Sequence, residues 1–179
     1  MAALFTLGGI AVAAEAVVGF AQSYEPLGGV ARLRMMSGAA VQQVHWRRVR
    51  TVLSGDGWWP AGLDGLDYDA QLTLACAAPR SIRSASNVIV LPAGRRADAG
   101  YTPIGHALLT GAGTQVGGGD LVPTPVSMGG DTATLTVVSG AAGYQVTWWP
   151  VLTVFADPPT AETDARGATH RWSLTAEEV

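Results

Sequence analysis

The sequence predicts a mainly β fold, a β-sandwich or β-barrel, and three observations favour it. Ten Pro and 23 Gly divide the 179 residues into short pieces, which is unusual for a helical protein. Most apolar, β-branched runs between these breaks are of the length usual for strands. In residues 132–137, threonines alternate with Ala133, Leu135 and Val137, the pattern of a strand with one buried face. The length predicts a single β-rich domain, 1–179, with two small domains as the alternative.

We expect eight strands, each bounded by glycine, proline or polar residues. In chain order they are Ala3–Leu7, Ile10–Val18, Val30–Met36, Gln71–Cys76, Asn87–Leu91, Ala133–Val138, Tyr144–Phe155 and Thr169–Leu174. The first two are expected to meet across a Gly8-Gly9 turn. The opening run also resembles a secretion signal, but no basic residue precedes it and Glu15 ends it, so we interpret it as strands.

Two segments admit more than one interpretation. Val41 to Leu53 has apolar residues at helical spacing, whereas its Thr, Val and Trp residues favour a strand, and we predict a strand. Pro150 lies inside the run from Tyr144 to Phe155. Because proline cannot donate a hydrogen bond to a ladder, this run is expected to be an edge strand, a bulged strand or two strands.

Residues 92–131 hold ten glycines and few large apolar side chains. We predict a long glycine-rich loop or extended arm here. Structureless loops of this length are uncommon in compact domains and are usually functional or mobile. In a subunit of an assembly, such a segment would reach a neighbouring subunit.

The chain is poor in charge, because 14% of its residues are Asp, Glu, Lys or Arg against roughly 25% in ordinary soluble domains. So few charges leave wide apolar regions on the surface, and large exposed apolar patches indicate a partner. The composition therefore favours a subunit of something larger, with a compact monomer of biased codon usage as the alternative. A net charge of −3 offers no general attraction for nucleic acid or an anionic membrane.

The charges also fall in blocks. No residue from Pro26 to Gly55 is acidic, yet five of the eleven arginines lie there: Arg32, Arg34, Arg47, Arg48 and Arg50. Acidic residues follow at once, as Asp56, Asp64, Asp67 and Asp69. These blocks would form a solvated face, pair within the fold, or meet across a subunit boundary, where complementary charge sets orientation and register.

The sequence contains few residues in patterns typical of catalysis, cofactor binding or metal binding. The sequence has no nucleophile elbow, zinc-protease motif, Walker loop or complete dinucleotide fingerprint. Asp64, Asp67 and Asp69 are spaced somewhat like a calcium loop but lack its sixth-position glycine and twelfth-position glutamate. Cys76 is the single cysteine, which excludes an internal disulfide, and its apolar setting predicts a buried, inert thiol. We therefore expect neither an enzyme nor a cofactor or metal site.

Two tryptophan pairs are the most distinctive feature, Trp58-Trp59 and Trp148-Trp149. Neighbouring residues in a strand point to opposite faces, so one tryptophan of each pair can face outward. Outward tryptophans suit sugar stacking or the anchoring of a subunit interface, while packing in the core or in turns is the alternative.

The run from Arg34 to Ile82, with Ser54-Gly55-Asp56-Gly57-Trp58 as its most specific part, resembles tail-tip and baseplate structural proteins of long-tailed bacteriophages, particularly small distal-tail subunits. Two segments near the end of the chain, WWPVLTVFADPP and HRWSLTAEEV, resemble the same proteins. The resemblance implies a β-sandwich or tail-tube-like β-barrel and no cofactor. It further implies a ring homo-oligomer, expected as a hexamer, that joins the tail tube to the baseplate through other tail proteins. The virion would be its location, after assembly in the bacterial host cytoplasm.

The predicted function is thus that of a structural subunit without catalytic residues. Its contact residues are expected to be Arg47, Arg48, Trp58, Trp59, Trp148 and Trp149. A monomeric carbohydrate-binding module that uses the same exposed tryptophans is the alternative.

Overall fold

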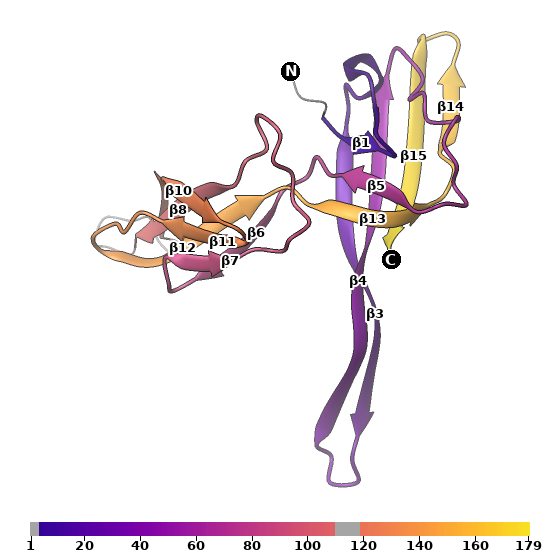
Figure 1. Cartoon of the computed structure of the whole chain (residues 1–179). Coiled ribbons are helices and arrows are strands. Elements are labelled where there is room, and N and C mark those ends of the chain that lie inside the picture. Colours follow the sequence, from indigo (N-terminus) through magenta and orange to yellow (C-terminus); the bar gives the residue numbers. More distant parts are fainter. Residues whose placement is uncertain (1–3, 110–118) are drawn as a thin grey trace. The chain divides into compact units, whose positions relative to one another are not determined.

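The computed structural model describes residues 4–109 and 119–179, and the chain is mainly β, as predicted (Figure 1). Its strands form several antiparallel sheets, consistent with a β-sandwich. Among the described residues, the helical structure is a short 3-10 turn, η1 (Ala14–Ala16). Within this part of the chain, no helix has the length and apolar character needed to cross a membrane.

The chain divides into two compact units, whereas its length led us to expect one domain. The sheet unit comprises residues 3–74 and 152–179, and the insert unit is built from residues 75–151. The chain leaves the sheet unit after β5 (Leu72–Ala75) and returns through β13 (Val151–Ala156), a neighbour of β5 in the same sheet. Each unit has buried apolar side chains of its own, which is the property that defines a domain.

The sheet unit is built on an eight-stranded sheet. Its strand order is β2 (Ile10–Ala11), β1 (Thr6–Leu7), β5, β13, β15 (Thr169–Glu178), β4 (Ala40–Gly57) and β3 (Ala21–Arg34), with β14 (Thr160–Asp164) paired to β15. Leu53, Leu74, Val154 and Leu174 are buried on it. Trp172 packs against the rings of Phe5 and Phe20, and its Nε1 donates a hydrogen bond to the Ala16 carbonyl at 2.8 Å.

The predictions for the first strands are partly confirmed. β1 and β2 meet across Gly8 and Gly9, whose φ angles of 57° and 82° favour glycine, so the predicted Gly-Gly turn is correct. The strand expected over Ile10–Val18 ends at Ala11, and that part of the prediction is wrong. The turn η1 follows instead, because it places Ala16 and Val17 in the core and the Ala16 carbonyl beside Trp172.

A long hairpin of β3 and β4 forms the other end of the sheet. The strand predicted at Val41–Leu53 is confirmed as the middle of β4. β3 begins at Ala21, well before the expected Val30, and pairs with β4 along its whole length. Pro26 is tolerated inside β3 because β3 is the last strand of the sheet and needs no ladder partner on its outer side.

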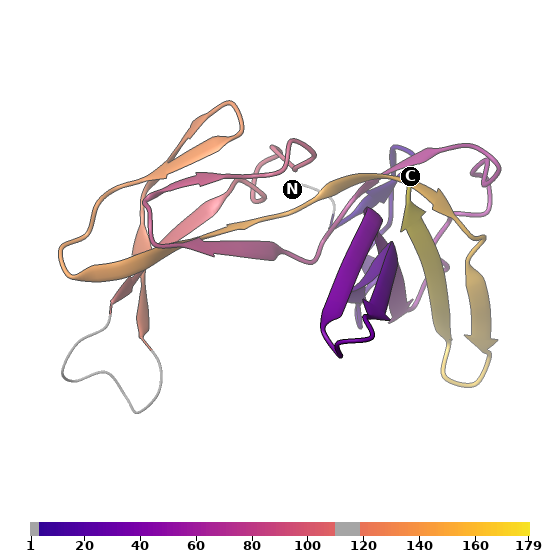
Figure 2. The same cartoon turned by 90° about the horizontal axis from the view of Figure 1, so that it is seen from below.

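The insert unit is a sandwich of two antiparallel sheets (Figure 2). One sheet has the order β10 (Val126–Gly129), β11 (Thr132–Leu135), β7 (Val88–Val90), and the other β6 (Arg80–Ser84), β12 (Ala141–Trp148), β8 (Ile104–Leu109), β9 (Asp120–Thr124). Both contribute to one core, with Ile89 and Leu135 from the first sheet and Val146 and Trp148 from the second. The predicted alternation holds for Ala133 and Leu135, whereas Val137 lies beyond the strand and is exposed.

Strands β8, β9 and β10 lie inside residues 92–131, where we expected a loop or arm, and there the prediction is wrong. Its part at 110–118 lies outside the described residues. Gly105 explains the error, because this glycine lies in a strand and is required by packing. A Cβ on it would come within 2.8 Å of Leu135 Cδ2 and 2.9 Å of the Thr124 carbonyl oxygen. This glycine therefore allows close packing within a strand rather than a loop.

Pro150 separates two strands, β12 and β13, which confirms one of the three outcomes expected for this run. Its own backbone forms an isolated bridge with Arg95 instead of continuing a ladder. The proline thus marks the place where the chain passes from one strand to the next, as its missing N–H group requires.

Candidate functional site

The hairpin of β3 and β4 extends far beyond the sheet that holds its base. β15 pairs with β4 only from Arg50 to Gly57, whereas β3 and β4 stay paired with each other out to Arg34 and Ala40. Residues 27–48, called the arm below, therefore form a two-stranded ribbon with no further strand on either side (Figure 1). Such a ribbon is at best marginally stable by itself in water, and β15 supports only its base.

The root of the arm is held by the end of β15. Arg50 donates from Nε to Glu177 at 2.8 Å, and the Val49 amide donates to Glu178 Oε2 at 3.0 Å. Arg48 Nε donates to the Val179 carbonyl. The hydrogen bond and charge of Glu177 raise the pKa of Arg50 above its ordinary value. These successive contacts fix the place where the arm begins.

The register of the ribbon sorts its side chains onto two faces. An apolar face carries Leu27, Ala31, Leu33, Val41 and Trp46, together with Gln43 and Arg48. A basic face carries Arg32, Arg34 and Arg47, together with Val30, Val44, Ala40 and Gln42. The bulge between Gly29 and Val30, opposite His45, keeps both faces continuous by absorbing one extra residue of β4.

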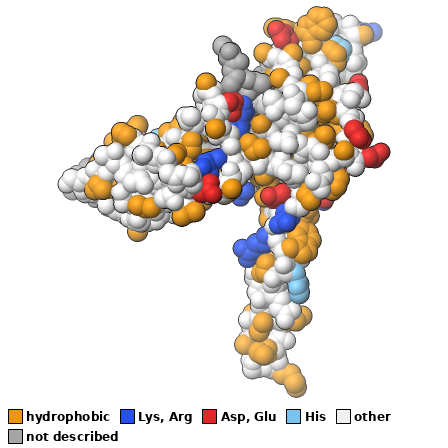
Figure 3. Space-filling model, viewed as in Figure 1, with side chains coloured by type: hydrophobic (Ala, Val, Ile, Leu, Met, Phe, Trp, Pro, Cys, Tyr) orange, Lys and Arg blue, Asp and Glu red, His pale blue; other side chains and the backbone are white. Residues whose placement is uncertain are grey.

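Large apolar side chains on the arm are open to solvent. Trp46 is 48% exposed, Leu33 55%, and Met36 in the turn at the tip is fully exposed. On the view in Figure 3, hydrophobic side chains follow the arm to its tip and no acidic side chain lies beyond its root. Contiguous exposed apolar surface of this kind marks an interaction site rather than ordinary protein surface.

The arginines of the arm have no acidic partner. Within the described residues, none of Arg32, Arg34, Arg47 and Arg48 forms an ion pair with a carboxylate. Arg34 instead donates to the Gly38 carbonyl across the turn at 3.2 Å. The rest of the sheet unit is acidic, with eleven carboxylate side chains against three arginines. The sequence left open a solvated face, ion pairing within the fold or a subunit contact, and within the described residues no ion pair with an Asp or Glu forms at these four arginines.

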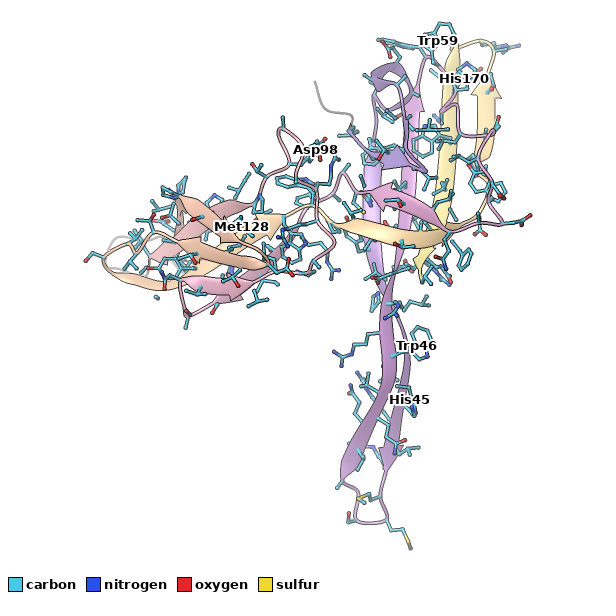
Figure 4. The ribbon with its side chains drawn as sticks, in the orientation of Figure 1. His45, Trp46, Trp59, Asp98, Met128 and His170 are labelled. Carbon is cyan, nitrogen blue, oxygen red and sulfur yellow. The ribbon has the colours of Figure 1, made fainter. Side chains whose placement is uncertain are left out.

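A second exposed surface begins where β4 ends. Trp58 and Trp59 are 65% and 64% exposed, and Figure 4 shows Trp59 at the end of the sheet unit opposite the arm residues His45 and Trp46. The loop that they open, residues 58–71, carries exposed carboxylates at Asp64, Asp67 and Asp69 and no arginine. We call it the acidic loop.

The acidic loop has a fixed conformation although its carboxylates face solvent. Leu63 is fully buried, and Tyr68 donates its hydroxyl to the Leu63 carbonyl at 2.9 Å. The Asp69 amide donates to Asp67 Oδ1 at 3.1 Å, and the Trp58 amide to the Glu15 carbonyl at 2.8 Å. These contacts fix the backbone of the loop and the carboxylate of Asp67.

Four of the six predicted contact residues lie on these two surfaces: Arg47 and Arg48 on the arm, Trp58 and Trp59 beside the acidic loop. Trp148 does not, and its assignment as a contact residue is corrected here. It is 4% exposed and packs in the core of the insert unit. Its neighbour Trp149 is half-buried against Tyr101, with the ring centroids 5.5 Å apart.

The exposed apolar residues of the arm, Trp46, Leu33 and Met36, were not among the residues predicted from the sequence. The signal was present as the acid-free stretch from Pro26 to Gly55. It was not recognised, because apolar residues in a predicted strand are normally assigned to a buried face. β4 is a strand, as predicted, but its residues from Ala40 to Arg48 are exposed.

No metal-binding arrangement appears in residues 4–109 and 119–179. There, no three His, Cys, Asp or Glu side chains come together to hold a metal ion, and Asp64, Asp67 and Asp69 form no such group. Cys76 is buried, as predicted. Arg96 is also buried and forms a forked pair with Asp98, with Nε to Oδ1 at 3.0 Å and Nη2 to Oδ2 at 2.6 Å. The hydrogen bond from Arg96 lowers the pKa of Asp98, so this carboxylate is a fixed structural partner.

Comparisons of the chain with protein-family models, with curated proteins and with solved structures found no match. The resemblance to distal-tail subunits stays a prediction, and the function has to be argued from the two surfaces themselves.

Proposed function

We propose that this chain is a structural subunit that assembles with copies of itself. The single observation that carries this proposal is the arm, a two-stranded ribbon with Trp46, Leu33 and Met36 exposed. Exposed edges with unpaired N–H and C=O groups pair readily with other chains, and a protein that leaves them uncovered risks aggregation. Assembly covers both the apolar side chains and the edges.

The finer form of the proposal is a distal-tail subunit of a long-tailed bacteriophage. The β-rich fold and the low charge content agree with the resemblance in residues 34–82. In that role the chain forms a ring, expected as a hexamer, that joins the tail tube to other baseplate proteins in the virion. Cyclic symmetry closes such a ring so that every contact surface is used.

An arm-less variant tests the proposal. Residues 28–47 are replaced by Asn-Gly, which joins the paired residues Leu27 and Arg48 by a two-residue hairpin loop. Light scattering after size exclusion, with negative-stain images of the same peak, gives mass and shape. We expect closed rings for the natural chain and a folded monomer for the variant.

A natural chain that remains an 18.4 kDa monomer at every concentration contradicts self-assembly. Open filaments in place of rings leave self-assembly intact and contradict the ring. Six-fold class averages would support the tail role, and a different symmetry would count against the expected hexamer.

A carbohydrate-binding module is the second candidate, favoured by one observation, the exposure of Trp58 and Trp59. Flat aromatic rings open to solvent are suited to stacking against sugars. This function predicts that Trp fluorescence responds to a glycan panel and that the response is lost in Trp59→Ala. The matched control is Trp46→Ala on the arm. A panel without any response excludes the candidate.

A further inference from the structure

The two exposed surfaces of the sheet unit are opposite in charge and lie at opposite ends of one strand. β4 begins at Ala40, inside the arm, and ends at Gly57, directly before Trp58. The arm carries four arginines and no carboxylate, whereas the acidic loop carries three carboxylates and no arginine. One molecule cannot bring these ends together, because the length of β4 separates them (Figure 4).

Pairing of two arms with each other is disfavoured by the same charges. A symmetric contact of basic face on basic face would bring Arg32, Arg34 and Arg47 of one copy against those of a second copy, with no carboxylate on either arm to neutralise them. Like charges that face each other across an interface cost free energy. The basic face of the arm therefore requires an acidic partner.

We propose that the arm of one copy docks on the acidic loop and the Trp58–Trp59 pair of the next copy. This inference rests on the proposed self-assembly and names its contact. The occupant is a second copy because the chain itself offers the complementary chemistry: unpaired arginines on one surface, and carboxylates with open aromatic rings on the other.

Each part of the contact has a definite role. Arg32 and Arg47 of the basic face meet Asp64 and Asp69, since guanidinium groups bind carboxylates in forked pairs. Trp58 and Trp59 offer ring faces on which a guanidinium can stack. Trp46 and Leu33 lie on the other face of the ribbon and remain available to a further contact of the assembly, since tryptophan is a favoured anchor of interfaces.

The proposed contact joins two different surfaces, so it is heterologous. Repeating it places every arm on the following subunit, and the result is a ring when the rotation closes and a filament when it does not. The symmetric alternative, arm on arm, stops at a dimer. The contact thus supplies the direction that ring assembly needs.

A charge-swap experiment tests the contact in the full-length chain. Arg32→Glu with Arg47→Glu makes an arm variant, and Asp64→Arg with Asp69→Arg makes a loop variant. All four side chains are exposed, and none forms a side-chain hydrogen bond or ion pair within the described residues, so both variants should fold. Arg166→Glu and Asp120→Arg, both exposed and outside the arm and the acidic loop, are the control variants. Circular dichroism and thermal unfolding verify the fold of each protein.

We expect each swapped variant alone to lose the oligomer peak at a concentration where the natural chain is fully assembled. Mixed one to one, the two variants should assemble again, because each reversed arm meets a reversed loop and each natural arm meets a natural loop. The restored particles alternate the two variants and so contain even numbers of subunits. The control variants should assemble like the natural chain.

Three outcomes overturn the proposal. Variants that assemble by themselves as the natural chain does, or folded variants whose mixture stays monomeric, show that these surfaces do not meet, while self-assembly through other contacts stands. Mixed dimers of the arm variant with the natural chain indicate the arm-on-arm pair. A natural chain that stays monomeric, including one that instead binds anionic vesicles or DNA through its arm, overturns the contact and the proposed assembly together.

Discussion

The two halves of β4 are a controlled comparison within one strand. From Arg50 to Gly57, β4 lies between β3 and β15, and from Ala40 to Arg48 it lies beside β3 alone. In the first half Thr51, Leu53, Gly55 and Gly57 are buried in strict alternation, and in the second half no residue is buried. Each half holds two β-branched residues, Thr51 and Val52 in the first and Val41 and Val44 in the second. The difference shows that local sequence is enough for β4 to be a strand along its whole length. Its side chains are buried only where a second strand, β15, also pairs with it.

Deleting buried atoms should separate the two halves most strongly. Leu53→Ala removes a fully buried side chain and is expected to lower the free energy of unfolding by about 2–5 kcal/mol. Val44→Ala, on the exposed half, should change it by no more than ~0.5 kcal/mol in the monomer. Chemical denaturation of both variants measures the difference. Equal losses would mean that the arm packs against something within its own chain.

Two glycines that face tryptophan rings sharpen the comparison. A Cβ on Gly55 would lie 2.8 Å from Trp172, and a Cβ on Gly29 would lie 2.8 Å from Trp46 Nε1. Trp172 is buried and cannot move aside, so Gly55→Ala should cost about 1–3 kcal/mol. Trp46 is exposed and free to turn away, so Gly29→Ala should leave the thermal unfolding midpoint nearly unchanged. A large loss for Gly29→Ala would show that the Trp46 ring is fixed.

The tryptophans themselves form the next pair. Trp172→Phe removes the hydrogen bond from Nε1 to the buried Ala16 carbonyl and should cost about 1 kcal/mol of unfolding free energy. Trp46→Phe should have almost no effect on unfolding. In assembly the order should reverse, with Trp46→Phe weakening the oligomer in light scattering and Trp172→Phe leaving it intact. If the two variants had equal effects on unfolding and equal effects on assembly, Trp172 could not be assigned to the core and Trp46 to the contact.

The smallest effect is expected at the junction of the two halves. Arg50 and Glu177 are partly exposed and joined at 2.6 Å, so their coupling should be small and sensitive to salt. A double-mutant cycle with Arg50→Gln and Glu177→Gln measures it, and about 0.5 M salt should screen most of it. A coupling that resists salt would indicate that the root of the arm is shielded from solvent.

The comparison also shows how far the sequence predicts the fold. The alternation at Ala133 and Leu135, the Gly8-Gly9 turn and the break at Pro150 are local features, and each is confirmed. Residues 92–131 were assigned to a loop because glycines were taken as breaks. Gly105 needed the opposite interpretation, since it lies in a strand against Leu135, and that contact joins residues far apart in the chain.

The candidate site divides in the same way. The acid-free stretch with its arginines and the exposed Trp58–Trp59 pair were visible in the sequence as candidates. The exposure of Trp46 and the burial of Trp148 were not, because both tryptophans lie in strands and only packing decides which of these strands is covered. Whether a second sheet covers a strand depends on where distant segments pack, which periodicity along the chain does not record.

The sequence alone determined the β character of this protein, its turns and the separation of its charges, since each follows from neighbouring residues. The tertiary structure decided that residues 75–151 form their own unit and that residues 27–48 remain a bare ribbon. The physical reason is that backbone conformation is set largely by neighbouring residues, whereas burial is set by contacts between distant ones. In β4 the pairing with the distant strand β15 ends at Arg50, and the exposed arm begins just beyond that residue.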